Sequence, residues 1–397
     1  MDLITSEMQG YLANSSAIRK MFEAGIELRK KYGAENVYDF SLGNPDLPPP
    51  AKVADALREA AGKAGEPFSI GYMPNAGYPA LREKMAAKLA VEQQVPLKAE
   101  HVLMTCGAAG GINVFFRAVL QAGEEVLTPS PYFVEYGFYA GHTGGKLVPV
   151  PTMKDTFALD IDAFAAAVNE RTRAVIINSP NNPTGVIYSR QELEKLAEVL
   201  NATEDRYGKP IFVVADEPYR CLNFDGVEIP SLLSIFRHSV VIGSFSKSLS
   251  LAGERIGFIA VRPGMEGGEA LMNALILCNR ILGFVNAPAL AQQILLTCLD
   301  EEIDLDIYRR RRQAMADVLD AAGIEYQMPK GAFYFFPKVP VADEAKFFEA
   351  MTSECVLVVP GRSFGLAGHF RMTFCVDEDI IRRSGPGIAR AVAKVRN

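Results

Sequence analysis

The sequence lacks an excess of basic residues, a paired-cysteine motif and a long uninterrupted hydrophobic run. Its 41 lysines and arginines stand against 47 aspartates and glutamates, a formal net charge of −6, which argues against a nucleic-acid partner. The six cysteines are scattered, without any C-x-x-C pair (Cys106, Cys221, Cys278, Cys298, Cys355 and Cys375). Their spacing predicts neither a zinc site nor a disulfide framework. We expect reduced cysteines, no bound metal and a cytoplasmic location.

No segment has the pattern of a membrane span or an export signal. The longest apolar region, residues 270–299, is interrupted by three asparagines, an arginine and a proline, which a membrane span does not tolerate without partners. We expect two buried helices joined near residues 284–288. The amino terminus, MDLITSEMQGYLANSS, contains acidic residues and no apolar run after a basic flank, unlike a signal peptide. Neither a membrane partner nor export is expected.

The chain of 397 residues is long enough for a large domain with a smaller one. Short β-rich runs alternate with longer stretches of helical periodicity, which predicts an α/β fold with a mainly parallel sheet covered by helices. The expected strands are 101–105, 125–128, 174–178, 211–215, 239–243 and 256–261, and clear helices are expected at 81–91, 112–121 and 191–200. In such sheets, ligands bind beyond the carboxyl ends of the strands.

Two changes in composition suggest where the domains divide. A proline-rich passage lies at 45–50, and a shift to long helices followed by short strands begins near Asn286. We predict an amino-terminal arm that forms part of a small domain (1–47), a large domain (48–285) and a small α+β carboxyl-terminal domain (286–397). Because chain ends commonly meet, the arm should pack with the small domain.

The strongest local signal is the sequence Ser244-Phe245-Ser246-Lys247, directly after the expected strand 239–243. A buried lysine loses its charge readily and can form a Schiff base with an aldehyde. The hydroxyls of Ser244 and Ser246 suit a phosphate, as does the guanidinium of Arg255, eight residues after the lysine. An isolated motif of this kind is more often a polar surface loop, so the interpretation depends on partners.

Partners follow three other expected strands. Asp216 and Tyr219 lie in DEPY after strand 211–215, and Asn182 lies in SPNNPTG after strand 174–178, where a plain Asn-Pro turn is the alternative. The segment 105–111, TCGAAGG, has small residues that let backbone N–H groups at a helix start approach an anion, although they also suit tight packing. It lacks the G-x-G-x-x-G and GK[ST] patterns of nucleotide sites.

As an ordered set, these motifs resemble the fold-type I pyridoxal-phosphate enzymes, specifically the class I aminotransferases that include aspartate aminotransferase. The resemblance covers essentially the whole chain, from GNPD at 43–46 and YMPNAGY at 72–78 to GAFY at 331–334 and Arg371. It implies a mainly parallel seven-stranded sheet with a smaller α+β domain. It also implies pyridoxal 5'-phosphate as cofactor and a homodimer with shared active sites. The implied reaction is ping-pong transfer of the amino group of an L-amino acid to a 2-oxo acid.

The resemblance also implies roles for individual residues. Lys247 would bind the cofactor and move the proton, Asp216 would pair with the pyridine nitrogen, and Tyr219 and Asn182 would bind the ring's phenolic oxygen. The phosphate would be held by the N–H groups of Ala108 and Ala109, by Ser244, Ser246 and Arg255, and by Tyr72 of the partner subunit. Phe133 would stack on the ring, unless it is a core residue. Arg371 would bind the substrate α-carboxylate beside Gly43 and Asn182.

The substrate is left open by the sequence. Arg280 is one position away from the second arginine that binds a side-chain carboxylate in some aspartate aminotransferases, and otherwise it is a helix-face residue. Asn44 stands where many relatives have glutamate, and no role follows for it. Aspartate, glutamate and aromatic amino acids are all candidate donors. A β-C–S lyase shares every cofactor residue, and a non-catalytic regulatory domain would need a DNA-binding segment ahead of it.

Overall fold

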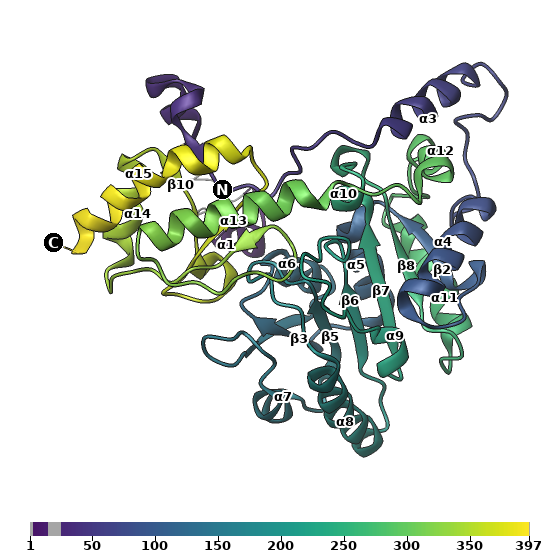
Figure 1. Ribbon diagram of the computed structural model, residues 1–397. Helices are drawn as coiled ribbons and strands as arrows, with labels where there is room; N and C mark the ends of the chain where they lie inside the picture. The colour runs from purple at the N-terminus through teal and green to yellow at the C-terminus, as the bar shows by residue number, and fades with distance from the viewer. Residues whose placement is uncertain (1–2, 15–24, 397) are drawn as a thin grey trace.

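The computed structural model describes residues 3–14 and 25–396, so part of the expected amino-terminal arm lies outside the described residues, as do residues 1–2 and 397. A seven-stranded sheet with the order β2-β8-β7-β6-β5-β3-β4 forms the centre of the larger part (Figure 1). Its strands are β2 (Val102–Thr105), β3 (Glu125–Ser130), β4 (Lys146–Pro151), β5 (Thr172–Asn178), β6 (Phe212–Asp216), β7 (Ser239–Ser244) and β8 (Gly257–Val261). Only β8 runs antiparallel to its neighbours. The mainly parallel α/β fold is thereby confirmed.

The central strands form because they are apolar along their whole length, as strands covered on both faces must be. Every residue of β6 and of β8 is buried. Strand β4, KLVPVP, was not expected from the sequence because it contains two prolines. Proline cannot donate to a sheet ladder, but β4 lies at the sheet edge and pairs only with β3.

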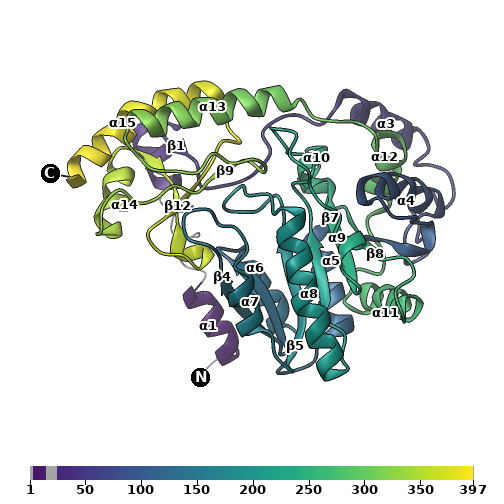
Figure 2. The ribbon, with the colours of Figure 1, turned by 60° about the horizontal axis from the view of Figure 1, so that its bottom comes forward.

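Helices cover both faces of this sheet (Figure 2). Alternate residues of each strand point to opposite faces, and in β5 the pair Ala174 and Ile176 belongs to a different core cluster from Val175 and Ile177. The first cluster includes α5 (Gly107–Val119), α6 (Glu135–Gly141) and α11 (Gly268–Ile281). The second includes α3 (Ala51–Gly62), α4 (Pro79–Gln93), α7 (Ile161–Ala167), α8 (Arg190–Tyr207), α9 (Leu232–Ile235) and α12 (Ala289–Cys298).

The apolar region 270–299 contains the two helices expected there, α11 and α12. Both contribute buried residues to the cores of the large sheet. Across the described residues, no helix combines the length and the hydrophobicity needed to span a membrane.

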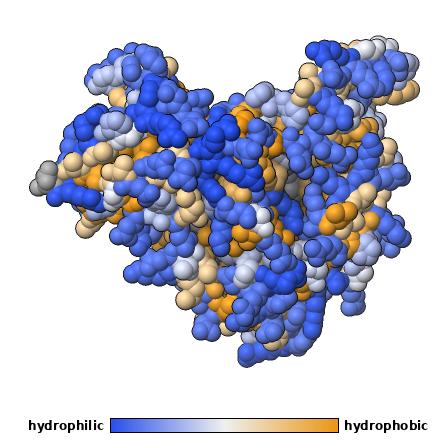
Figure 3. Space-filling view, in the orientation of Figure 1, coloured by the Kyte–Doolittle hydropathy of each residue, from blue (hydrophilic) through white to orange (hydrophobic). Residues whose placement is uncertain are grey.

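A second, smaller core lies beside the sheet. Its helices are α13 (Leu305–Ala321), α14 (Glu344–Ser353) and α15 (Glu378–Arg396), and its short strands are β9 (Tyr334–Phe335), β10 (Val356–Leu357), β11 (Val359–Pro360) and β12 (Phe370–Thr373). Strand β1 (Tyr38–Asp39) pairs with β10, which joins the amino-terminal segment to this core. Helix α1 (Ser6–Asn14) lies instead against α6, with the rings of Tyr11 and Phe138 4.7 Å apart. The outer surface over α13 and α15 is mainly hydrophilic (Figure 3).

Candidate active site

The candidate active site lies at the carboxyl ends of three adjacent parallel strands. In the sheet register Asn178 of β5 lies opposite Asp216 of β6, and Asp216 lies opposite Ile242 of β7. Strand β7 ends at Ser244 and leads directly into the short helix α10 (Phe245–Ser248), which carries Lys247. The motifs that follow these strands in the sequence are therefore neighbours in space.

The amine of Lys247 is largely enclosed. Its Nζ donates a hydrogen bond to the carbonyl oxygen of Gly43 over 2.7 Å and lies 5.3 Å from the centre of the Phe333 ring. Burial lowers the pKa of Lys247 to about 8, and the charges of Arg371 and Arg255 act in the same direction. Close approach explains the glycine at 43, because a Cβ there would lie 1.8 Å from Tyr334 Oη. A neutral, nucleophilic amine is thus accessible near neutral pH.

The carboxylate of Asp216 is buried and half satisfied. Its Oδ2 accepts hydrogen bonds from Tyr136 Oη and, over 3.4 Å, from Asn178 Nδ2. Its Oδ1 has no hydrogen-bond partner among the described residues. Burial raises the pKa of Asp216 to about 7, against the effect of the Tyr136 hydrogen bond. A buried, unpaired carboxylate oxygen is costly unless a ligand satisfies it.

A candidate anion site lies at the start of α5. The sequence predicts a loop at 105–111 and a helix from 112, which is wrong, because α5 begins at Gly107. Alanine favours helix, and the glycines allow close packing: a Cβ on Gly111 would lie 2.9 Å from Ile242. Ala108 and Ala109 therefore lie in the first turn, where N–H groups lack helical partners.

Arginine and hydroxyl groups lie beside that helix start. A Cβ on Gly107 would lie 2.8 Å from Arg255 Nη2, so the guanidinium sits directly against the first residue of α5. Ser244 and Ser246 are half-buried on the neighbouring strand end and helix α10. Unpaired N–H groups, hydroxyls and a guanidinium together form a suitable site for a phosphate.

The guanidinium of Arg371 is buried on the side of the smaller core. Its Nη1 donates to Asn182 Oδ1 over 3.0 Å and its Nη2 donates to the carbonyl of Ser41 over 2.7 Å. Its Nε has no partner among the described residues. The rings of Tyr334 and Phe364 lie 4.5 and 4.6 Å from it. Arg371 is therefore held in place while its Nε–H has no partner, and free N–H groups of a guanidinium suit a carboxylate.

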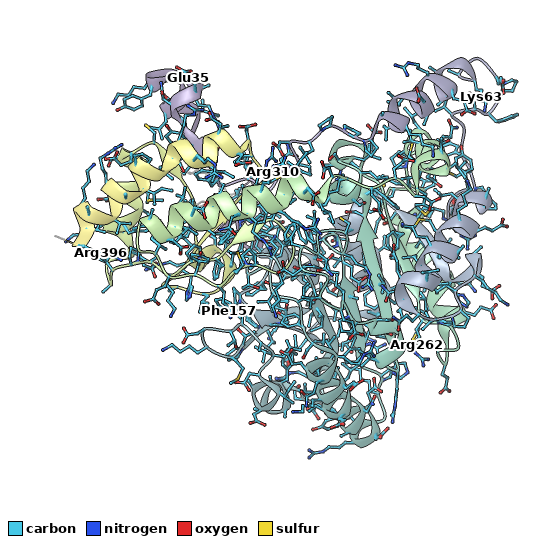
Figure 4. All side chains as sticks on the ribbon, in the orientation of Figure 1. Glu35, Lys63, Phe157, Arg262, Arg310 and Arg396 are labelled. Carbon is cyan, nitrogen blue, oxygen red and sulfur yellow. The ribbon has the colours of Figure 1, made fainter. Side chains whose placement is uncertain are left out.

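Phe364 is in turn held by contact between the two parts of the molecule. Phe157, labelled in Figure 4, lies in the segment after β4. It packs with Phe336 and Phe364 in a small apolar cluster, with the rings of Phe157 and Phe336 5.8 Å apart. The position of Arg371 thus depends on how the small core sits against the sheet.

The remaining candidate residues divide into those near this cluster and those outside it. Tyr219 Oη lies 3.2 Å from Tyr334 Oη, and the half-buried Phe133 ring lies 5.6 Å from that of Tyr136. Tyr72 is 88% exposed, and Arg280, near the end of α11, is also exposed. Neither is brought to the site within a single chain.

Two residues of the site were missed in the sequence, Tyr136 and Asn178, whereas Tyr334 was included in the GAFY motif without a role. Tyr136 follows Phe133 by three residues, and their rings lie 5.6 Å apart although Phe133 precedes α6. Asn178 is the only polar residue in the apolar end of its expected strand. Each signal is visible in retrospect, but neither identifies a ligand by itself.

The donor set fits a phosphorylated aldehyde cofactor: an amine of lowered pKa, an anion site at a helix start and a bare carboxylate oxygen. Together with the sheet topology, this arrangement defines a fold-type I pyridoxal-phosphate enzyme. The family described as aminotransferase class I and II matches residues 35–383. The chain belongs to this family, is an aminotransferase and uses pyridoxal 5'-phosphate.

Similarity to individual aminotransferases extends over nearly the whole chain. A solved aminotransferase from Eubacterium rectale is 36% identical, with a TM-score of 0.95 and 100% coverage of both chains. The aspartate/prephenate aminotransferase of Thermus thermophilus is 30% identical over 93% of this chain and 94% of its own length. Aromatic-amino-acid aminotransferase 2 of Thermococcus litoralis is 32% identical over 90% of each chain. These relatives favour amino transfer over the lyase alternative.

Proposed function

We propose that this aminotransferase moves the amino group of L-aspartate, L-glutamate or an aromatic L-amino acid to a 2-oxo acid by a ping-pong mechanism. The observation that carries the proposal is the convergence of Lys247 Nζ, the unpaired Oδ1 of Asp216 and the free Nε of Arg371 around one site. The names of the relatives from Thermus thermophilus and Thermococcus litoralis support aspartate and aromatic donors.

The cofactor is proposed to lie between Lys247 and Asp216. When bound, pyridoxal phosphate supplies the electron sink that allows the substrate to lose its Cα proton. Lys247 would hold it covalently and, with Nζ free, would move the proton between Cα of the substrate and C4′ of the cofactor. Asp216 Oδ1 would keep the ring nitrogen protonated, and Tyr219 and Asn182 would donate to the phenolic oxygen.

The phosphate and the substrate have separate sites in this proposal. The phosphate is held by the backbone N–H groups of Ala108 and Ala109 and the side chains of Ser244, Ser246 and Arg255. Phe133 covers the cofactor ring. Arg371 holds the α-carboxylate through its free Nε, with Asn182 and the Gly43 backbone beside it. The carbonyl oxygen of Gly43 accepts a hydrogen bond from Lys247 Nζ in this structure. The substrate would therefore bind where Lys247 leaves its hydrogen-bond partner.

A homodimer with shared active sites is also proposed. Phe68, Ile70 and Tyr72 are 90%, 66% and 88% exposed, and they follow α3, which projects from the body of the molecule (Figure 1). Neighbouring exposed apolar side chains on a projecting segment are typical of a protein interface. In the dimer, Tyr72 of the partner subunit completes the phosphate site.

The domain division and location are proposed as follows. Residues 48–285 form the large cofactor-binding domain, and 1–47 with 286–397 form the small one, although α12 (Ala289–Cys298) packs in the core of the large sheet. The six cysteines, all free, support a reducing, cytoplasmic location.

A half-reaction screen tests this proposal. Holoenzyme is mixed with one amino acid at a time, and the absorbance of the lysine-bound cofactor is followed. Loss of that absorbance with aspartate, glutamate or aromatic amino acids, with one equivalent of 2-oxo acid formed, is expected. Continuous 2-oxo acid production without an added acceptor would instead indicate the lyase. Borohydride reduction and peptide mapping should locate the cofactor on Lys247, and a label on any other lysine would refute its assignment.

A further inference from the structure

Tyr136 of α6 makes the shortest contact to Asp216, and the proposed mechanism does not yet use it. Its side chain is 1% exposed, and its Oη donates to Asp216 Oδ2. Its ring also meets the Phe133 ring edge-on, with an angle of 84° between the planes, so one side chain contacts both the carboxylate and the ring-covering phenylalanine.

The two oxygens of Asp216 are therefore not equivalent. Oδ2 is occupied by the donors of Tyr136 and Asn178, whereas Oδ1 has no partner among the described residues. We propose that Tyr136 is a positioning residue, which keeps the Asp216 carboxylate ionised and turned so that Oδ1 faces the cofactor's ring nitrogen. This inference rests on the proposed pairing of Asp216 with that nitrogen.

The electrostatic surroundings explain why a neutral donor is needed. Asp216 forms no ion pair within the part of the chain that the structure describes. Glu217 beside it is buried and acidic, and burial together with the Glu217 charge disfavours ionisation of Asp216. The other titratable groups facing it are Tyr219 from its own strand end and Tyr136 and Tyr139 from α6. None of these groups supplies a positive charge.

Tyr136 is suited to this task because it stays protonated. Burial raises the pKa of its phenol well above the ordinary value of 10.0, and the charge of Asp216 raises it further. The phenol can thus donate to the carboxylate across the whole working pH range, because it stays neutral while Asp216 carries the negative charge. A donor to an ionised acceptor forms a stronger hydrogen bond than a neutral pair does.

The test uses Tyr136→Phe, which removes the donor and keeps the ring. Tyr188→Phe is the matched control, because Tyr188 is also 1% exposed but lies in the cluster on the other face of the sheet. The measurement follows the infrared C=O band of protonated Asp216 against pH, in protein freed of cofactor. The band is assigned by its absence in Asp216→Asn. Tyr136→Phe should raise its midpoint by about one pH unit, a roughly tenfold gain in proton affinity.

A second readout examines the cofactor itself. Protein is reconstituted with pyridoxal phosphate carrying ¹⁵N in the ring, and the nitrogen shift is measured by NMR. In Tyr136→Phe it should move toward that of neutral pyridine, and in Tyr188→Phe it should stay with the wild type. An unchanged infrared midpoint and an unchanged nitrogen shift in Tyr136→Phe would overturn the inference.

The same experiment separates this inference from the proposed function. If Asp216→Ala leaves the nitrogen shift unchanged, the pairing of Asp216 with the ring is wrong, and the role of Tyr136 falls with it. If Asp216→Ala changes the shift but Tyr136→Phe changes neither the shift nor the infrared midpoint, the pairing stands and Tyr136 merely fills space.

Discussion

The lowered pKa of Lys247 should make the stability of the cofactor-free protein depend on pH in a defined way. The perturbation is Lys247→Met, which removes the amine and keeps an unbranched side chain. Burial lowers the pKa of this lysine from 10.5 to about 8. The unfolded chain therefore binds the proton more tightly than the folded chain does. Between these two values the unfolded state carries more protons, so the contribution of Lys247 to stability rises with pH.

The size of the effect follows from the difference between the two pKa values. A shift of this size corresponds to at most about 3 kcal/mol. The stabilising contribution is fully present above the unfolded pKa of 10.5 and is lost as pH falls through about 8. At neutral pH the wild-type protein bears the whole penalty of enclosing an ammonium group, and Lys247→Met does not. The free energy of unfolding of Lys247→Met minus that of the wild type should therefore fall by up to about 3 kcal/mol as pH rises from about 7 to about 10.5.

Urea unfolding of both cofactor-free proteins at a series of pH values measures this difference. Titration of groups that do not interact with Lys247 contributes equally to the two proteins and cancels. Lys63→Met serves as the control, because Lys63 is exposed directly after α3 and its amine forms a surface ion pair with Glu59. The free energies of unfolding of Lys247→Met and wild type could instead differ by the same amount at every pH. That result would refute the argument that burial sets the charge of this amine.

Four further outcomes are expected. Arg371→Ala should lower kcat/KM for every amino donor by a similar factor, about a hundredfold or more, because it removes the charge-assisted contact proposed with the α-carboxylate that all donors share. Half-reaction rates across several donors measure this effect, and a loss confined to one donor would contradict it. Arg255→Ala should weaken cofactor affinity about tenfold or more through the phosphate, measured by equilibrium dialysis, and unchanged retention would remove Arg255 from that site. Arg280→Ala should slow aspartate and glutamate selectively if this arginine binds a side-chain carboxylate, and equal rates before and after the change would exclude that role. Lys247→Ala and Tyr72→Asp chains, inactive alone, should regain activity when mixed after partial unfolding, because one site of each hybrid dimer is then intact; folded hybrids without activity would place Tyr72 in its own chain's site.

The sequence was most informative where a polar motif follows an apolar strand. Asp216 and the Ser244–Lys247 motif could be placed because β6 and β7 are apolar up to their last residues. Strand β4 could not be predicted because its prolines are compatible with a strand only at a sheet edge, and the edge is a property of the assembled sheet.

Tertiary contacts account for what the sequence left out of the site. The start of α5 depends on glycines that pack against β7 and β8, as the close approach of Gly111 to Ile242 illustrates. Tyr136 is 80 residues from its partner Asp216, so no local pattern joins them. Tyr72 is exposed in a single chain, and its proposed role across an interface comes from the family resemblance alone.

The side chains of β6 point alternately to the two faces of the sheet, so the register of this strand sets both its packing and the direction of Asp216. Phe212 and Val214 face one core, Val213 and Ala215 face the other, and Asp216 continues the same alternation. A single inserted residue within this strand would exchange its two apolar sets and turn the carboxylate away from the site. Apolar substitutions here can be accommodated by repacking, whereas a change of length cannot. In natural variants, the apolar residue types of β6 should therefore vary, whereas the number of residues in the strand should not. A library of single-residue insertions in β6 should yield no folded protein with partial activity.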